Sequence, residues 1–151
     1  MEKYVSDALE LPAPEEGERL VRVDFVFYGV DHSGPSYEAR VFVNNPDADV
    51  NTPRDASAGY AGSFTVFGHG GCYGDEGHCD REQQTRDAFD VRPPHPLTPW
   101  TKTVIVDEDL YPALGESVTV TVVAVVPGSA GPEATDALSF ERVRLVTHAD
   151  L

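Results

Sequence analysis

The feature that most constrains this chain is an alternation of apolar and polar residues with a period of two. Between residues 19 and 29 the apolar residues recur at every second position: Val21, Val23, Phe25 and Phe27. Arg22 and Asp24 occupy positions between them. Successive side chains of a β-strand point to opposite faces, so the pattern predicts a half-buried strand over residues 19–29.

Five more segments are rich in β-favouring residues: 37–43, 60–67, 100–106, 116–126 and 138–147. Segment 116–126 is nearly all Val and Thr, and because it is apolar on both faces we expect it at the centre of a sheet. No segment has a convincing amphipathic helical period, and Pro112 limits residues 107–115 to a short helical turn. The sequence therefore predicts an all-β fold, an antiparallel β-sandwich or small barrel of about six to seven strands.

The first 18 residues differ from the rest of the chain. They are rich in Pro and Glu and show no sustained period. We therefore expect residues 1–18 to be an N-terminal arm or linker, and residues 19–151 to form a single β domain. A chain of 151 residues has the size of one ordinary domain and can bury a core without many disulfides.

The charge of the chain argues against several partners. The 26 acidic and 11 basic residues give a net charge of -15, which repels phosphate backbones, so we expect no nucleic acid ligand. No apolar run reaches the roughly 20 residues of a membrane helix, and the N-terminus lacks a basic flank followed by an apolar stretch. We expect no membrane partner and a cytoplasmic location by default, with export alongside a partner as the alternative. The acidity itself is best explained by solubility, and the sequence leaves a high-salt habitat open.

A long loop over residues 68–99 gathers the metal-ligating side chains. It is rich in Gly and holds both cysteines, and its candidate ligands are His69, Cys72, His78 and Cys79, with His95 as a further candidate. Thiolate and imidazole suit copper or zinc. Two Cys separated by six residues match no standard zinc motif, so a Cys72–Cys79 disulfide and a pair of free thiols stay open as alternatives.

Signatures of catalysis are missing from the sequence. It has no Gly-x-Ser-x-Gly motif and no phosphate-binding Gly loop between a strand and a helix. The carboxylate runs at 75–76 and 107–109 fall in turns, where we expect them to be solvated. His32 and His148 are expected on the surface. Four aromatic residues are expected to pack between the sheets: Tyr60, Phe64, Phe67 and Trp100.

Several short motifs follow one another in a distinctive order. The strand-like segment 37–44 precedes an Ala-Gly-Ser-Phe stretch at 61–64, a Pro-Trp-Thr-Lys stretch at 99–102 and an acidic, Leu-containing turn at 109–115, after which come the Val-rich and last segments. This order, from Val21 onward, resembles the C-terminal β domain of the type-3 copper proteins, a family that includes plant polyphenol oxidases, tyrosinase-like enzymes and molluscan haemocyanins. The Ala-Gly-x-Phe stretch is the sharpest part of the resemblance.

The resemblance implies an accessory role without catalysis. In that family the dicopper oxidase site belongs to a separate helical domain and is built from histidines on helices. The present chain has five histidines, at 32, 69, 78, 95 and 148, and no two are spaced to share a helical face. The resemblance thus implies a β domain that packs over the copper site of a helical domain or subunit, in cis or in trans, and shields that site from substrate. No motif here identifies a side chain that enters the copper site.

The sequence is compatible with three functions. The first is a non-catalytic accessory domain that caps or assists a tyrosinase-like type-3 copper enzyme. The second is a stand-alone copper- or zinc-binding protein that uses the loop from His69 to Cys79, since some tyrosinase-like proteins and their helpers pass copper through Cys or His. The third is a generic β-sandwich interaction module whose loop is closed by a disulfide. Metal stoichiometry separates the first from the second, because a pure cap binds no metal.

Overall fold

A computed structural model describes residues 1–70, 88–89, 91, 97–128 and 137–150. Within these residues the chain forms nine strands: β1 (Lys3–Val5), β2 (Leu9–Glu10), β3 (Arg19–Val30), β4 (Tyr37–Val43), β5 (Tyr60–Val66), β6 (Trp100–Ile105), β7 (Ser117–Val118), β8 (Val120–Val125) and β9 (Arg142–Asp150). Two 3-10 helices accompany them: η1 (Ala56–Ala58) and η2 (Glu108–Ala113). Neither helix is long and apolar enough to cross a membrane, a finding that applies to the described residues.

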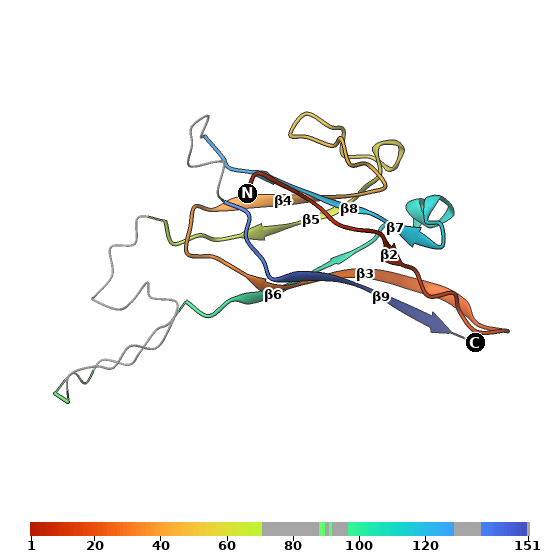
Figure 1. Cartoon of the computed structure of the whole chain (residues 1–151), viewed down its shortest axis with the longest axis horizontal. Coiled ribbons are helices and arrows are strands. Elements are labelled where there is room, and N and C mark those ends of the chain that lie inside the picture. Colours follow the sequence, from red (N-terminus) through yellow and green to blue (C-terminus); the bar gives the residue numbers. More distant parts are fainter. Residues whose placement is uncertain (71–87, 90, 92–96, 129–136, 151) are drawn as a thin grey trace.

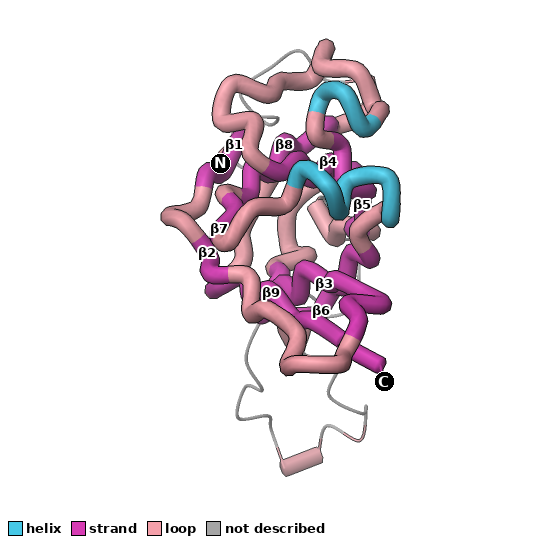
Figure 2. The backbone as a smooth tube through the Cα atoms, turned by 90° about the vertical axis from the view of Figure 1, so that its right-hand side faces the viewer, coloured by secondary structure: helices cyan, strands magenta, loops and turns pink. Residues whose placement is uncertain are grey.

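Two antiparallel sheets form the layers of a sandwich (Figures 1 and 2). One sheet has the strand order β1-β8-β4-β5 and the other has the order β6-β3-β9. The short pair β2-β7 lies at one side of the two layers. Over the described residues these sheets do not close into a barrel, so the predicted all-β sandwich is confirmed.

The alternating strand β3 supplies the centre of the core. Val23, Phe25 and Phe27 are fully buried between the sheets, as the period of two predicts. The Phe27 ring packs against Phe64 of the opposite sheet at a centroid distance of 5.0 Å and against Phe140 at 5.3 Å. Such tilted and edge-on pairs are the favoured aromatic geometries, so β3 joins the two layers through its aromatic face.

The Val-rich segment occupies an inner position in its sheet, as predicted. β8 lies between β1 and β4, with Val122 opposite Val41. The segment is divided in two because Thr119 pairs with Asn44, which ends β4 in a left-handed conformation (φ 52°). The Thr119 N–H donates to Asn44 Oδ1 at 3.0 Å, and the Asn44 N–H donates to the Thr119 carbonyl at 2.9 Å. Asn tolerates this conformation better than most residues, so it makes a suitable strand end.

Part of the predicted N-terminal arm is built into the sheets. β1 adds to the edge of β8, with Tyr4 opposite Val122, and β2 pairs with β7. The Ser6 hydroxyl accepts a hydrogen bond of 2.9 Å from the Val120 N–H. β1 and Ser6 thus satisfy backbone groups that β8 would otherwise expose at a sheet edge, and β2 does the same for β7.

The remaining sequence-based elements are close to the observed ones. The turn expected at 107–115 is η2, a single short 3-10 helix that accommodates Pro112. The last strand begins at Arg142 instead of residue 138, because the chain before it makes isolated contacts with the end of β3. The Ser139 carbonyl accepts from the Asp31 N–H, and the Glu141 N–H donates to the Tyr28 carbonyl, each at 2.9 Å.

Candidate functional site at the loop end of the sandwich

Two of the connections that run between the sheets lie at the same end of the molecule. Residues 31–36 join β3 to β4, and residues 67–99 join β5 to β6. Val30 is paired with Trp100 and Tyr37 with Val66, so the ends of β3 and β5 and the starts of β4 and β6 are brought together (Figure 1). We call this region, comprising residues 31–36, 67–70 and 97–100, the loop end.

Residues 68–70 run along the first crossing and fix its geometry. The His69 N–H donates to the His32 carbonyl at 2.9 Å, and the Gly70 N–H donates to the Gly34 carbonyl at 2.7 Å. A Cβ on Gly68 would overlap the Gly34 carbonyl oxygen and Pro35, so only glycine allows this close approach. The hydrogen bonds hold the His69 backbone against His32.

His32 is buried, contrary to the expectation that it lies on the surface. It is 5% exposed, and its ring stacks on Trp100 with a centroid distance of 3.9 Å and an interplanar angle of 14°. Lys102 Nζ lies 4.6 Å from the centroid of the same indole ring. The ring of His32 is thus covered by a residue 68 positions later in the chain, a contact that the local Gly-Pro turn does not reveal.

The side chains of His32 and His69 meet at the loop end. Their Nδ1 atoms are 3.3 Å apart, and the rings are arranged edge to face. His32 Nε2 lies 2.8 Å from the Thr98 carbonyl, which only accepts, so His32 carries its proton on Nε2 and the lone pair of the neutral ring lies on Nδ1. His69 Nδ1, which is also 3.2 Å from the His32 carbonyl, is then the donor of the pair. This tautomer assignment rests on the hydrogen-bond partners.

Of the predicted metal ligands, His69 is the one that the structure describes. Cys72, His78, Cys79 and His95 lie outside the described residues, as does the proposed Cys72–Cys79 disulfide. In the part of the chain that is described, no group of three or more His, Cys, Asp or Glu side chains is placed to hold a metal ion. The sequence alone did not indicate that His32 belongs to this site. Its only signal is that it is a histidine, like His69.

The four aromatic residues expected between the sheets behave differently from one another. Phe64 is buried in the core, whereas Phe67 is 75% exposed, which corrects its expected position. Phe67 directly follows β5 and continues the outward side of its alternation, because Phe64 and Val66 are buried whereas Thr65 is exposed. Tyr60 packs on Phe42 in a second, smaller cluster, and Trp100 covers His32.

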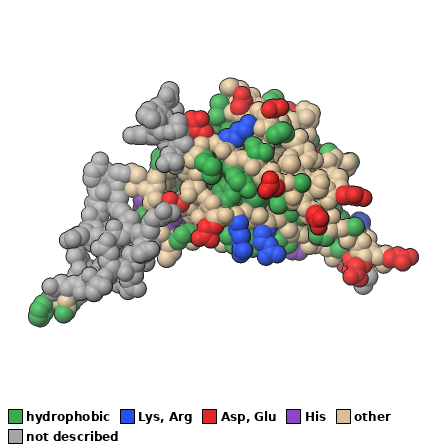
Figure 3. All heavy atoms as spheres, viewed as in Figure 1, with side chains coloured by type: hydrophobic (Ala, Val, Ile, Leu, Met, Phe, Trp, Pro, Cys, Tyr) green, Lys and Arg blue, Asp and Glu red, His purple; other side chains and the backbone are tan. Residues whose placement is uncertain are grey.

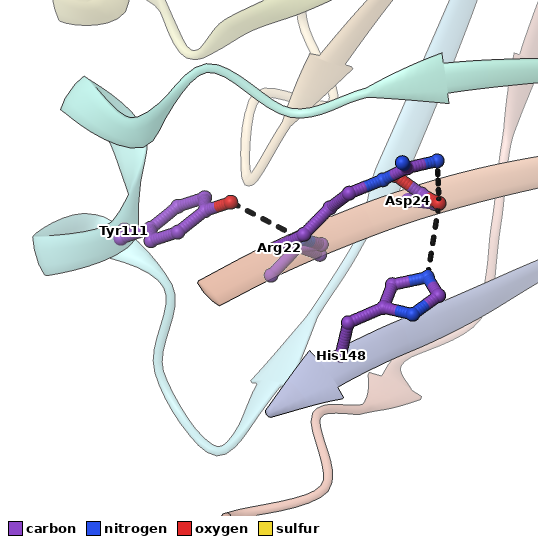
Figure 4. Close-up of polar contacts among 5 residues, drawn as sticks. Arg22, Asp24, Tyr111 and His148 are labelled. Atoms are coloured by element: carbon purple, nitrogen blue, oxygen red, sulfur yellow. Dashed lines mark hydrogen bonds and ion pairs between the residues drawn. The ribbon is translucent and has the colours of Figure 1, made fainter. Parts of the chain in front are cut away.

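His148 belongs to a polar cluster on β3 and β9 (Figure 4), and β9 runs away from the loop end (Figure 1). Its side chain is 49% exposed, and Nε2 lies 3.2 Å from Oδ2 of the buried Asp24. Beside them the Tyr111 hydroxyl accepts a hydrogen bond of 3.1 Å from the Val23 N–H. These contacts tie η2 and β9 to β3, so the cluster has a structural role.

The acidic residues of the described surface are scattered, and one of them caps a helix. Asp and Glu side chains are spread over the face shown in Figure 3. In the run at 107–109, Asp107 caps η2 by accepting a hydrogen bond of 3.0 Å from the Asp109 N–H. A groove of about 590 Å³ runs beside this cap and is lined by Tyr60, Ala61, Gly62, Ile105, Val106, Asp107, Glu108 and Asp109.

Comparison with sequence families gave no match, since neither a protein-family model nor a curated protein matches the chain. Solved structures do match. A latent aurone synthase (polyphenol oxidase) from natural source superposes with a TM-score of 0.52 at 18% identity, covering 97% of this chain and 24% of that one. Recombinantly expressed latent aurone synthase superposes with a TM-score of 0.54 at 19% identity, covering 98% and 24%.

A third structure, recombinant latent aurone synthase co-crystallized with hexatungstotellurate(VI), gives a TM-score of 0.55 at 18% identity over 98% of this chain and 24% of that one. The present chain therefore spans about a quarter of the length of the proteins that it matches. Nearly all of its fold is found within that quarter. The resemblance to the polyphenol oxidases that the sequence predicted is confirmed as a likeness of fold.

Proposed function

We propose that this chain is a non-catalytic accessory β domain that caps or assists a tyrosinase-like type-3 copper enzyme. The proposal rests on how much of each chain the superposition of the structures covers. Almost the entire chain corresponds in fold to about a quarter of a latent polyphenol oxidase. A β domain of this fold thus exists as one part of an oxidase. Most of that oxidase lies outside this domain.

The residues of this chain support a role outside the copper site. Its five histidines are too widely spaced to share a helical face, and the two helices of the described residues are of the 3-10 type, with three and six residues. Such short helices cannot present the histidines of a helical dicopper site. The catalytic part is then a helical domain or subunit, in cis or in trans, and this chain acts by covering the approach of substrate to it.

Charge narrows the kind of surface that this chain can cover. Its net charge of -15 disfavours association with another acidic protein, including a second copy of itself. A neutral or basic face on the helical partner is therefore expected, and the complex should form more slowly as the salt concentration rises.

The test begins with the DNA on either side of the coding sequence, where we expect a helical domain with His-x3-His pairs, encoded either in the same reading frame or in a neighbouring one. That protein is expressed with copper and mixed with the present chain, and the mixture is analysed by size-exclusion chromatography and calorimetry. A one-to-one complex is expected. An unrelated acidic β-sandwich of similar size is the control for charge. The absence of such a frame, or of a complex beyond this control, would contradict the proposal.

A further inference from the structure

The pairing of His32 with His69 at the loop end joins two parts of the chain that are 37 residues apart. One histidine follows β3 and the other follows β5, and their Nδ1 atoms are 3.3 Å apart. The backbone bonds from residues 69 and 70 to residues 32 and 34 keep the two positions in place. The backbones that carry the two histidines are therefore held together as part of the crossing between the sheets.

The distance between the two nitrogens agrees with the geometry of a metal site. Zinc–imidazole bonds are about 2.0–2.1 Å long, and two such bonds at a tetrahedral angle place their nitrogens about 3.3 Å apart. The Nδ1 atoms of His32 and His69 already have this separation. Neutral imidazole nitrogen is a favoured ligand of zinc and copper. We propose that His32 and His69 bind a Zn²⁺ or Cu⁺ ion through their Nδ1 atoms.

The surroundings of His32 are those of a metal-binding imidazole. Such a ring almost always donates its second N–H to a carboxylate, a backbone carbonyl or water, which fixes the tautomer and the ring orientation. His32 Nε2 lies 2.8 Å from the Thr98 carbonyl, and the ring is stacked on Trp100. The Nδ1 lone pair of His32 thus faces His69 Nδ1 before any ion binds.

His69 supplies the second ligand by a change of tautomer. In the pair its Nδ1 carries the proton that the metal replaces. This proton moves to Nε2 through solvent, which is accessible because the His69 side chain is only partly buried. The neutral ring loses no net proton in this step. The proposal does not depend on the accessory function, since it concerns this chain alone.

The test uses the full chain with Cys72 and Cys79 both replaced by Ser, so that thiol ligands do not contribute. Zn²⁺ is titrated against a chromophoric zinc chelator, and Cu⁺ is titrated anaerobically against bicinchoninate. We expect one ion per chain with at least micromolar affinity, about -8 kcal/mol. In the same background, His32→Gln and His69→Gln should each weaken binding at least about tenfold. His148→Gln, which changes a histidine of the other cluster, should leave the affinity unchanged.

Two spectroscopic signals locate the ion. Trp100 is the only tryptophan and stacks on His32, so its fluorescence should change as one equivalent of ion is added. A long-range ¹H–¹⁵N spectrum of the imidazoles should show shifts of Nδ1 in both His32 and His69. Circular dichroism establishes that each variant is folded, and the partly exposed His69 gives the safer variant. Binding of neither ion, or equal binding by the chain with both cysteines replaced and by its folded His69→Gln variant, would overturn the proposal.

Discussion

Arg22 and Asp24, two residues apart on β3, form a bidentate ion pair on the face of the sheet opposite the core. Arg22 Nε and a terminal guanidinium nitrogen each donate a hydrogen bond of 2.7 Å to the Asp24 carboxylate, which is 4% exposed. These bonds from Arg22 outweigh the effect of burial and, with the nearby His148, hold the pKa of Asp24 below its usual range. The polar face of an alternating strand is therefore not solvated at every position.

Asp24→Asn should destabilise the protein at neutral pH. The folded-state pKa of Asp24 is lowered, so its stabilising effect is present above the unfolded value of about 3.9 and is lost as the pH falls through the folded value. Urea unfolding at pH 7 should show a loss of about 1–3 kcal/mol for the variant. This difference between wild type and variant should shrink below about pH 4. A difference that stayed constant from pH 7 to pH 2 would contradict the assigned ion pair.

Tyr37→Phe should protect the protein against alkaline unfolding. Burial, with a smaller effect of the Asp31 charge, raises the pKa of Tyr37 to about 12. Between about pH 10 and 12 the phenol ionises in the unfolded chain but not in the folded one, so stability falls as the pH rises, by at most about 3 kcal/mol. Denaturant unfolding of both proteins across this pH range measures the effect. Parallel losses in wild type and variant would show that Tyr37 is not the group responsible.

Phe27→Ala should cost about 3–5 kcal/mol, because it opens a cavity at the centre of the core. Phe27 is fully buried and contacts Phe64 and Phe140. The matched control is Phe67→Ala, which removes an aromatic ring that is 75% exposed and should change stability by no more than about 0.5 kcal/mol. Thermal and urea unfolding report both values, and similar costs for the two variants would argue against the described core.

Ser6→Ala should cost about 1–3 kcal/mol by leaving the buried Val120 N–H without its acceptor. The control is Ser57→Ala, whose hydroxyl contacts the exposed Asp55, and we expect a change within about 0.5 kcal/mol. Urea unfolding compares the two variants. A neutral result for Ser6→Ala would show that the segment after β1 does not stabilise the fold as the contacts indicate.

The strands with several alternating residues could be predicted from the sequence. The segment at 37–43 has the same bounds in the structure, and 19–29 is one residue short of β3. By contrast, β1 and β2 have three and two residues, too few to show a period, and their partners lie more than 100 residues away. Their pairing is a tertiary effect that local pattern cannot reveal.

The candidate site could be predicted only in part for the same reason. The sequence indicates His69 because ligand-type residues gather near it. His32 stands alone in its turn, and its burial depends on the pairing of Val30 with Trp100, which brings the indole ring over the imidazole. The exposure of Phe67, by contrast, follows from the period of two, since Phe64 and Val66 occupy the buried side. The residue types indicate the chemistry of the site. That His32 and His69 lie side by side follows only from the strand topology.

The most direct measurement of the accessory role is the oxygen consumption of the copper-loaded helical partner acting on catechol, with increasing amounts of this chain. If the chain caps the copper site, the rate should fall in proportion to the complex formed and recover when proteolysis removes the chain. The acidic control protein should leave the rate unchanged. An oxidation rate unaffected at saturating chain, with the complex demonstrated in the same solution, would contradict capping.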